Sequence, residues 1–324
     1  MKTTLFSIAT LSALALLATA CTADLRPETD PETGGSGAAL VPVSLRVALE
    51  NGEAATRAAT YTNLTTDGAV VTLTMLTAGG TGYYANHYHT PYTYTAGKWV
   101  AENPIYVDNR TAGQIIACYD PNTKTAFEAA GTQTPIAVSE YNEDLLWYYD
   151  NTHKSINSTD AALDIKLKCA YSRLSLKLSR AESYPGDCKI TRVRIASADG
   201  SLITAATVNM TDGTLTNATA HDYTIDITGT PLANDGLAVD APDESIDLLL
   251  PAQALTAGLV VALTVDGFDV QTSVPPAKFS DSALKQGVHY SLHIGFAAVE
   301  VKVEQVTVED WTLTNLSDNY TPEL

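Results

Sequence analysis

Apolar residues recur at every second position along much of this 324-residue chain, and amphipathic helical periods are almost absent. The segment 41–49 shows the alternation most clearly. Its predicted inner face consists of Val41, Val43, Leu45, Val47 and Leu49. A strand with this pattern buries one face and exposes the other. The alternation therefore predicts an all-β protein whose first strand spans residues 40–50.

Strand-like segments also fill the second half of the chain, separated by turns rich in Gly and Asn. We predict strands at 189–196, 201–209, 222–227, 246–250, 259–265, 290–296 and 299–308. The inward phase set by Leu163, Ile165 and Leu167 slips by one residue before Leu174, which predicts a bulge or a bend. Short strands at this spacing are typical of β-sandwiches.

The chain beyond residue 39 is long enough for two domains of ordinary size. The polar segment 150–160 (DNTHKSINSTD) is the expected boundary between them. We therefore predict two β-sandwich domains in series, an N-terminal one over 40–158 and a C-terminal one over 159–324.

The first twenty residues have the pattern of an export signal. A basic Lys2 precedes an apolar run that is too short to span a bilayer, and small residues follow at 18–20. Cys21 comes directly after them, where a bacterial lipoprotein carries its acyl groups, palmitate among them. We expect a lipoprotein signal peptide at 1–20, a lipid on Cys21 and an outer-membrane location. The alternative is an ordinary secretion signal with a Cys nearby.

Residues 21–39 read as a flexible tether, because Pro, Gly, Thr and acidic residues cannot bury a core. The net charge of −18 argues against nucleic acid and anionic lipid surfaces as partners. A strongly acidic protein of this kind suits a surface exposed to the medium.

Three cysteines remain beyond the tether: Cys118, Cys169 and Cys188. Export permits a disulfide, and Cys169–Cys188 is the pair nearest in sequence, but buried thiols fit equally well. The two histidine pairs, His87/His89 and His289/His293, lack the further ligands of a zinc site. We expect no metal and no cofactor.

The sequence contains neither a nucleophile turn of the type G-x-S-x-G nor a glycine-rich phosphate-binding motif. We therefore expect no catalytic residues and no enzymatic activity. The aromatic run Tyr83–Trp99 could stack sugar rings as a binding face, or its side chains could pack across a sheet. The sequence leaves both alternatives open.

The first strand and the loop after it suggest a role in assembly. If an Arg-specific protease cut at Arg57, the strand 40–50 could leave and expose an apolar groove. Burial of its five inward side chains corresponds to roughly 8–15 kcal/mol, comparable with the stability of a whole domain. Such a groove would favour a strand from another subunit. The alternative is an uncut sandwich with an ordinary loop.

Several short segments, in this order, resemble the fimbrillin family, the type V pilus subunits of Bacteroides-type bacteria. They are 86–106 (NHYHTPYTYTAGKWVAENPIY), 116–121 (IACYDP), 144–146 (DLL), 248–253 (LLLPAQ), 286–292 (QGVHYSL) and 303–311 (VEQVTVEDW). The resemblance covers nearly the whole chain beyond the tether. It implies two transthyretin-like sandwiches, export as a lipoprotein and polymerisation by donor-strand exchange.

The resemblance also implies trimming by an Arg-specific protease after the first strand. Arg57 matches that position best, and Arg46 is the alternative, although a cut there would split the strand. The expected partners are other pilus subunits, the protease, the outer membrane through the Cys21 lipid, and a host glycan or protein. Shaft, tip and anchor roles stay open, and the alternative function is a lipid-anchored glycan-binding module.

Overall fold

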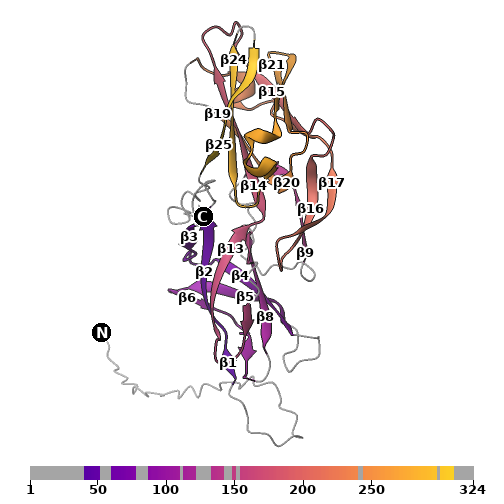
Figure 1. Ribbon diagram of the computed structural model, residues 1–324. Helices are drawn as coiled ribbons and strands as arrows, with labels where there is room; N and C mark the ends of the chain where they lie inside the picture. Colours follow the sequence, from indigo (N-terminus) through magenta and orange to yellow (C-terminus); the bar gives the residue numbers. More distant parts are fainter. Residues whose placement is uncertain are drawn as a thin grey trace, which may run out of the picture. The chain divides into compact units, whose positions relative to one another are not determined.

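The computed structural model describes residues 40–51, 60–77, 87–109, 112–121, 133–141, 148–150, 154–239, 244–297 and 300–309. Almost all of the regular structure in these ranges is β-strand (Figure 1), which confirms the all-β prediction. The short helices described are α1 (Pro231–Asn234) and the 3₁₀ turns η2 (Pro276–Lys278) and η3 (Ser280–Ser282).

The first half of the chain forms most of a large mixed sheet. Its spatial order is β3 (Thr60–Asn63), β2 (Ser44–Asn51), β13 (Ala162–Cys169), β11 (Tyr148–Tyr149), β8 (Gly113–Tyr119), β4 (Val70–Thr77), β5 (His87–Thr95) and β6 (Lys98–Val100), with β12 (Lys154–Ile156) also on β8. Nearby, β1 (Val41–Pro42) pairs with β7 (Tyr106–Val107). The inward side chains form one apolar core that includes Leu73, Ile105 and Leu167.

The second half contributes most of four smaller sheets. The first is β10 (Ser139–Glu140), β19 (Glu244–Pro251), β14 (Tyr171–Arg180), β24 (His289–Ala297) and β25 (Glu300–Glu309), and the second is β18 (Tyr223–Asp226), β15 (Ile190–Ala196), β21 (Leu259–Val265) and β22 (Phe268–Val274). The others are β17 (Leu215–Ala220), β16 (Ile203–Asn209) and β9 (Gln133–Ala137), and β20 (Gln253–Ala254) with β23 (Ala283–Leu284). A second core, with Leu176, Leu263 and Phe296, lies among them.

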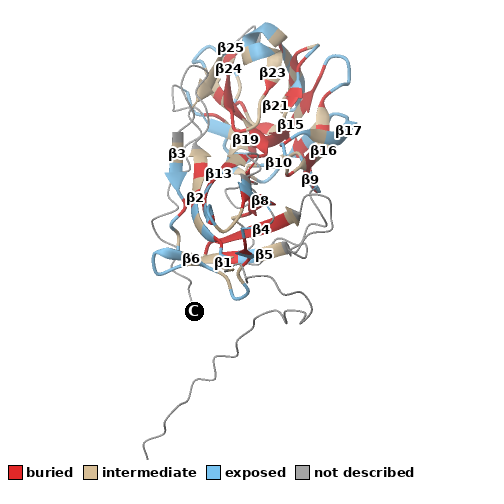
Figure 2. Cartoon of the chain, turned by 60° about the horizontal axis from the view of Figure 1, so that its bottom comes forward, coloured by how far each residue is buried: buried red, intermediate tan, exposed pale blue. Residues whose placement is uncertain are grey.

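The two cores account for the one-residue slip in the alternation. In β13 the inward side chains belong to the first core, whereas Leu174, Leu176 and Leu178 of β14 belong to the second. Only Ala170 separates these strands, and they lie in different sheets. The slip is thus a bend at which the chain passes from one sheet to the next. Figure 2 shows buried residues in red, among them residues of β4 in the first core and of β19 in the second.

Strand pairing crosses the expected boundary at residue 158 in both directions. β13 lies after it but pairs with β2, in parallel, in the first sheet. β9 and β10 lie before it but pair with β16 and β19. The division into two domains at this residue stays a prediction, and each half contributes strands to the sheets of the other.

A buried tyrosine of β11 joins two turns from distant parts of the chain. The Tyr149 hydroxyl donates to the Gln286 Oε1 atom at 2.5 Å, and the Gln286 side-chain amide donates to the Gly213 carbonyl at 3.0 Å. Gly213 has a φ of 76°, and a Cβ placed on it would lie 1.9 Å from the Tyr149 Oη atom. Glycine is therefore required here by both backbone conformation and space.

We predict that Gly213→Ala destabilises the protein more than Gly200→Ala does. Both glycines have a positive φ, 76° and 72°, so alanine costs each about 1–2 kcal/mol. A Cβ at Gly200 meets nothing within 4 Å, whereas one at Gly213 must displace Tyr149, which adds about 1–3 kcal/mol. Chemical denaturation of the two variants measures the difference. Equal destabilisation would mean that the tyrosine moves away without loss.

Candidate functional site

The predicted first strand 40–50 is divided into β1 and β2, and β2 occupies an interior position of the large sheet. β2 pairs antiparallel with β3 on one side and parallel with β13 on the other. Just before it, the Val43 amide donates to the Ile105 carbonyl at 2.8 Å and the Ser44 amide to the Ala161 carbonyl at 2.9 Å. The strand therefore fills a site formed by β3, β13 and the backbone at Ile105 and Ala161. We call this site the seat of β2.

The predicted inner face of the strand is the face that packs into the core. Val43, Val47 and Leu49 are 4%, 4% and 1% exposed, and Val41 and Leu45 are half-buried against the same core. The three fully buried side chains correspond to roughly 5–9 kcal/mol of apolar burial. Removal of this strand would uncover a surface whose burial accounts for much of the stability of an ordinary domain.

The outer face of β2 carries charges that pair with β13. The Arg46 Nε atom lies 2.8 Å from the Asp164 Oδ1 atom, and this pair is largely exposed. The Glu50 carboxylate accepts a hydrogen bond from the Tyr61 hydroxyl at 3.2 Å and lies 4.0 Å from the Lys168 ammonium. The proposed cleavage site Arg57 and the proposed lipid site Cys21 lie outside the described residues.

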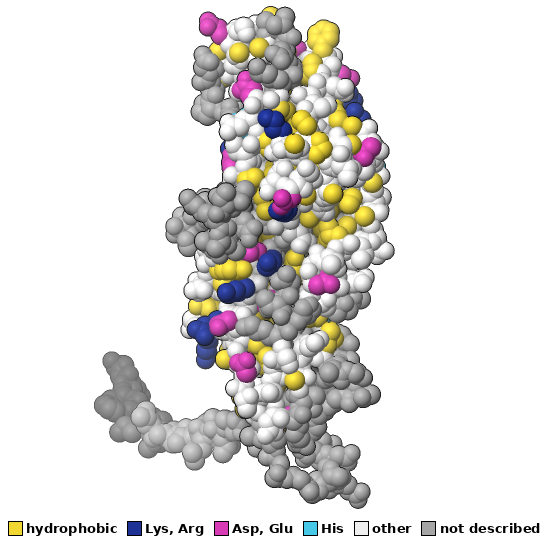
Figure 3. Space-filling model, in the orientation of Figure 1, with side chains coloured by type: hydrophobic (Ala, Val, Ile, Leu, Met, Phe, Trp, Pro, Cys, Tyr) yellow, Lys and Arg dark blue, Asp and Glu magenta, His cyan; other side chains and the backbone are white. Residues whose placement is uncertain are grey.

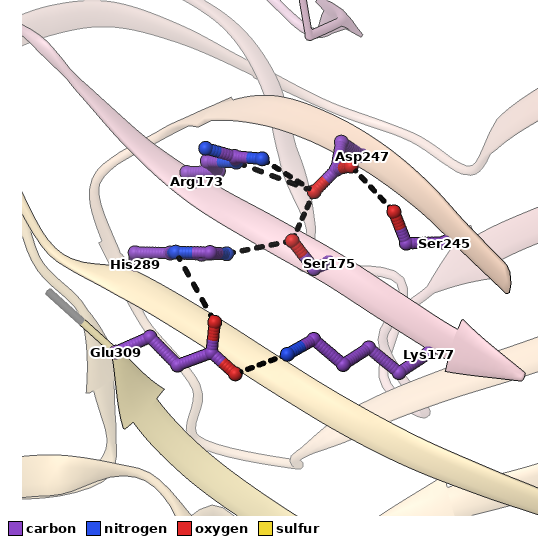
Figure 4. Close-up of polar contacts among 7 residues, drawn as sticks. All are labelled: Arg173, Ser175, Lys177, Ser245, Asp247, His289 and Glu309. Atoms are coloured by element: carbon purple, nitrogen blue, oxygen red, sulfur yellow. Dashed lines mark hydrogen bonds and ion pairs between the residues drawn. The ribbon is translucent and has the colours of Figure 1, made fainter. Parts of the chain in front are cut away.

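A second polar group lies on the five-stranded sheet (Figure 4). The Ser175 hydroxyl contacts Asp247 and lies 2.6 Å from the His289 Nε2 atom. Arg173 also donates to the Asp247 carboxylate, at 3.1 and 3.2 Å, and its guanidinium stacks over the Tyr141 ring at 3.8 Å. This cluster was not predicted from the sequence, because its residues meet only through the register of three strands. The only local sign of the cluster in the sequence is that polar residues such as Arg173, Ser175 and Asp247 lie within Leu-rich strands.

At the edge strand β25, Glu309 extends the cluster. It contacts the Lys177 ammonium and lies 3.8 Å from the His289 Nδ1 atom. Burial, with the nearby Arg173 charge, lowers the pKa of His289 to about 4. Burial alone would raise the pKa of Asp247, but hydrogen bonds from Ser175 and Ser245 and the Arg173 charge hold it below its usual value.

Ser175, His289 and Asp247 are three residue types of a hydrolase triad, but their connections are those of a structural cluster. A serine hydroxyl has one proton, and the Asp247 carboxylate can only accept it. The His289 Nε2 atom must then donate to Ser175, whereas a general base would accept the proton. Ser175 is also only 1% exposed, which leaves a substrate no access.

The aromatic residues described in the run 83–99 take part in packing. Tyr92 is 2% exposed, and its hydroxyl oxygen accepts from the Ile105 amide at 3.0 Å. The Tyr94 and Trp99 rings meet edge to face at 5.3 Å and pack on the first core. These three side chains therefore match the packing alternative, and residues 83–86 lie outside the described ranges.

Cys118, Cys169 and Cys188 are buried, and Cys169 is not bridged to Cys188. Cys169 lies in the first core and Cys188 in the second, so the pair nearest in sequence is separated by the fold. Within the described ranges, no three His, Cys, Asp or Glu side chains gather closely enough to hold a metal ion. None of the helices in the described part of the chain has the length and hydropathy needed to span a membrane.

A model of the fimbrillin-like family matches residues 56–311, which confirms the resemblance expected from the sequence. No curated protein matches the chain. A solved structure of a candidate cell adhesion protein from Bacteroides uniformis is 23% identical, covers 82% of this chain and 99% of its own, and has a TM-score of 0.55. Another, from Bacteroides ovatus, is 11% identical, covers 85% and 100%, and has a TM-score of 0.56. At these identities the two structures support the fold alone.

The position of His289 predicts a pH-dependent loss of stability. Its folded pKa of about 4 lies below the ordinary 6.5, so the unfolded chain binds a proton between these values while the folded chain does not. Stability therefore falls as the pH drops through this window, by about 3 kcal/mol. His289→Gln removes this loss and keeps a donor for Ser175.

Denaturant unfolding of the wild type and of His289→Gln at pH 7, 5.5 and 4 measures the effect. The wild type should lose about 3 kcal/mol more than the variant over this range. Asp247 and Glu309 are present in both proteins, so their titration largely cancels. Parallel stability curves for the two proteins would contradict the prediction.

Proposed function

Because the chain belongs to the fimbrillin-like family, we propose that it is a structural or tip subunit of a type V pilus that serves cell adhesion. The observation that carries the proposal is the seat of β2, a strand held between β3 and β13 with Val47 and Leu49 of the strand and the preceding Val43 buried. The family consists of fimbrial structural proteins and adhesins, so the chain is not an enzyme.

In this proposal the chain is exported as a lipoprotein precursor, held in the outer membrane through a lipid on Cys21. An Arg-specific protease then cuts after Arg57, and the strand 40–50 leaves its seat. The edges of β3 and β13 and the pockets of Val43, Val47 and Leu49 become available together. Unpaired strand edges and uncovered apolar surface both favour pairing with a strand from another subunit.

The pairing of Arg46 argues against a cut at that residue and so favours the proposed cleavage after Arg57. Arg46 lies within β2, where its backbone is paired with Asp164 of β13. A protease binds its substrate as a free extended segment, so a cut at Arg46 would require prior unfolding of the sheet. A cut at Arg57 would leave the whole strand 40–50 free to dissociate.

The role within the pilus follows from how far the precursor is processed. A shaft subunit would lose the lipid and the first strand, a tip subunit would accept a strand without donating one, and an anchor would keep Cys21 and its lipid. Other pilus subunits are the proposed partners in each case, at the cell surface. A host glycan or protein is the proposed adhesion target.

Arg57→Ala should prevent trimming and polymerisation, because the first strand then stays attached and keeps its seat. Arg46→Ala is the matched control and should be trimmed and assembled normally. The N-terminus and intact mass of the surface protein report the cut, and polymer ladders on gels after mild heating report assembly. Polymers built from uncut Arg57→Ala chains would exclude strand removal as the mechanism.

Cys21→Ser should abolish acylation and release the uncut precursor from the membrane fraction. Metabolic labelling with a fatty acid, followed by fractionation, measures both effects. Thr22→Ser, next to the proposed site, should be labelled like the wild type. Labelled Cys21→Ser protein in the membrane would mean that the chain is anchored in another way.

A further inference from the structure

β13 presents three charged side chains to the strand that lies beside it. Asp164, Lys166 and Lys168 follow one another at alternate positions on its outer face. We infer that this charged row selects the direction and register of any strand seated against β13. The partner that fits is an extended segment parallel to β13, with a cation beside Asp164 and a carboxylate four residues later. This inference rests on the proposed function, in which β2 is replaced.

In the intact chain, charged residues of β2 pair with charged residues of this row. Arg46 is directly opposite Asp164 in the register of the two strands, and their charged groups are 2.8 Å apart. Glu50 reaches Lys168 at 4.0 Å. On the face visible in Figure 3, dark blue basic and magenta acidic side chains lie close together over β2 and β13. The cation and the carboxylate of β2 thus each face an opposite charge.

The Glu50 end of the row is the more enclosed one. The Glu50 side chain is 9% exposed, against 83% for Arg46. Tyr61, directly opposite on β3, donates its hydroxyl to the carboxylate at 3.2 Å. The Lys166 ammonium lies 4.9 Å from the centre of the Tyr61 ring and adds positive charge at this end. A carboxylate is therefore favoured more strongly here than a cation is beside Asp164.

Neither the apolar face nor the backbone ladder can select the register alone. A shift of two residues toward the end of β13 keeps the same face of the strand inward and places an aliphatic side chain in each pocket, whereas the opposite shift would place Asn51 in the pocket of Leu49. The ladder of backbone hydrogen bonds also repeats every two residues. The charges on the outer face are the contacts that distinguish the native register from the shift toward the end of β13.

The charged row disfavours the incorrect arrangements. In the reversed direction, centred on Lys166, Arg46 would face Lys168 and Glu50 would face Asp164, so both contacts become repulsive. A two-residue shift toward the end of β13 places Arg46 opposite Lys166 and leaves Glu50 opposite Ala170. A shift the other way loses the Arg46–Asp164 contact but places Glu50 opposite Lys166, so this shift is disfavoured without any repulsion. Exposed ion pairs add little to affinity, but repulsion in the alternatives provides specificity.

Peptide exchange into the nicked protein tests the inference. The full chain is cut at Arg57 with an Arg-specific protease, and a fluorescent peptide spanning 40–57 is added in excess. A charge-swapped peptide, Arg46→Glu with Glu50→Lys, is compared with the native one. The matched control peptide, Ser44→Thr, changes an outward residue without changing charge. Fluorescence anisotropy measures how tightly each peptide is bound.

The swapped peptide should bind about ten-fold more weakly than the native one, which corresponds to about 1.4 kcal/mol. The preference should invert on the protein carrying Asp164→Lys and Lys168→Glu, which a general loss of folding cannot produce. The discrimination should shrink in 1 M salt, where the screening length is about 3 Å. Equal binding of both peptides to both proteins overturns the inference and leaves the proposed function intact.

If not even the native peptide enters the nicked protein, strand replacement itself fails. The role of the charged row is then tested on the uncut chain. The free energy of unfolding is measured for Arg46→Glu with Glu50→Lys, for Asp164→Lys with Lys168→Glu, and for all four substitutions together. Restored stability in the combined variant supports the role of the row in setting the register of β2. Additive losses overturn it.

Discussion

The pairing of β2 with β13 is the contact on which the rest of the structure depends. The two strands are parallel, so no hairpin can join them, and residues 52–161 lie between them in sequence. A pairing of this kind has to overcome the entropy of closing a long loop. The buried side chains of Val43, Val47 and Leu49 offset that cost. β2 is thus held by β13, which follows much later in the sequence.

The position of β13 extends the consequences of this pairing to the second core. β13 passes through Ala170 into β14, which lies between β19 and β24 in the five-stranded sheet. A strand seated on β13 therefore supports a segment that continues into the other core. The same sheet edge, left uncovered, would be open to pairing with another chain. Occupation of this one seat matters for both stability and association.

The alternation in the sequence was sufficient to predict the inner strands. The predicted segments 189–196 and 259–265 agree closely with β15 and β21, because strands with one buried face carry the period of two most clearly. β17 and β22 were not predicted. They lie at sheet edges and are largely exposed, so little burial constrains their residues. The bend at Ala170 left a slip in phase but no sign that the next strand joins another sheet.

Polar contacts could not be predicted, because they depend on which residues the register brings together. Arg173 and Ser175 meet Asp247 and His289 only after three strands from distant parts of the sequence are aligned. The pair of Arg46 with Asp164 likewise needs the parallel pairing of β2 with β13. Hydrophobic alternation determines which face of a strand is inward, and it is unchanged by a shift of two residues. Selection among such shifts therefore requires contacts that do not repeat every two residues. The buried polar cluster supplies such contacts on the five-stranded sheet, and the charged row supplies them at the seat of β2.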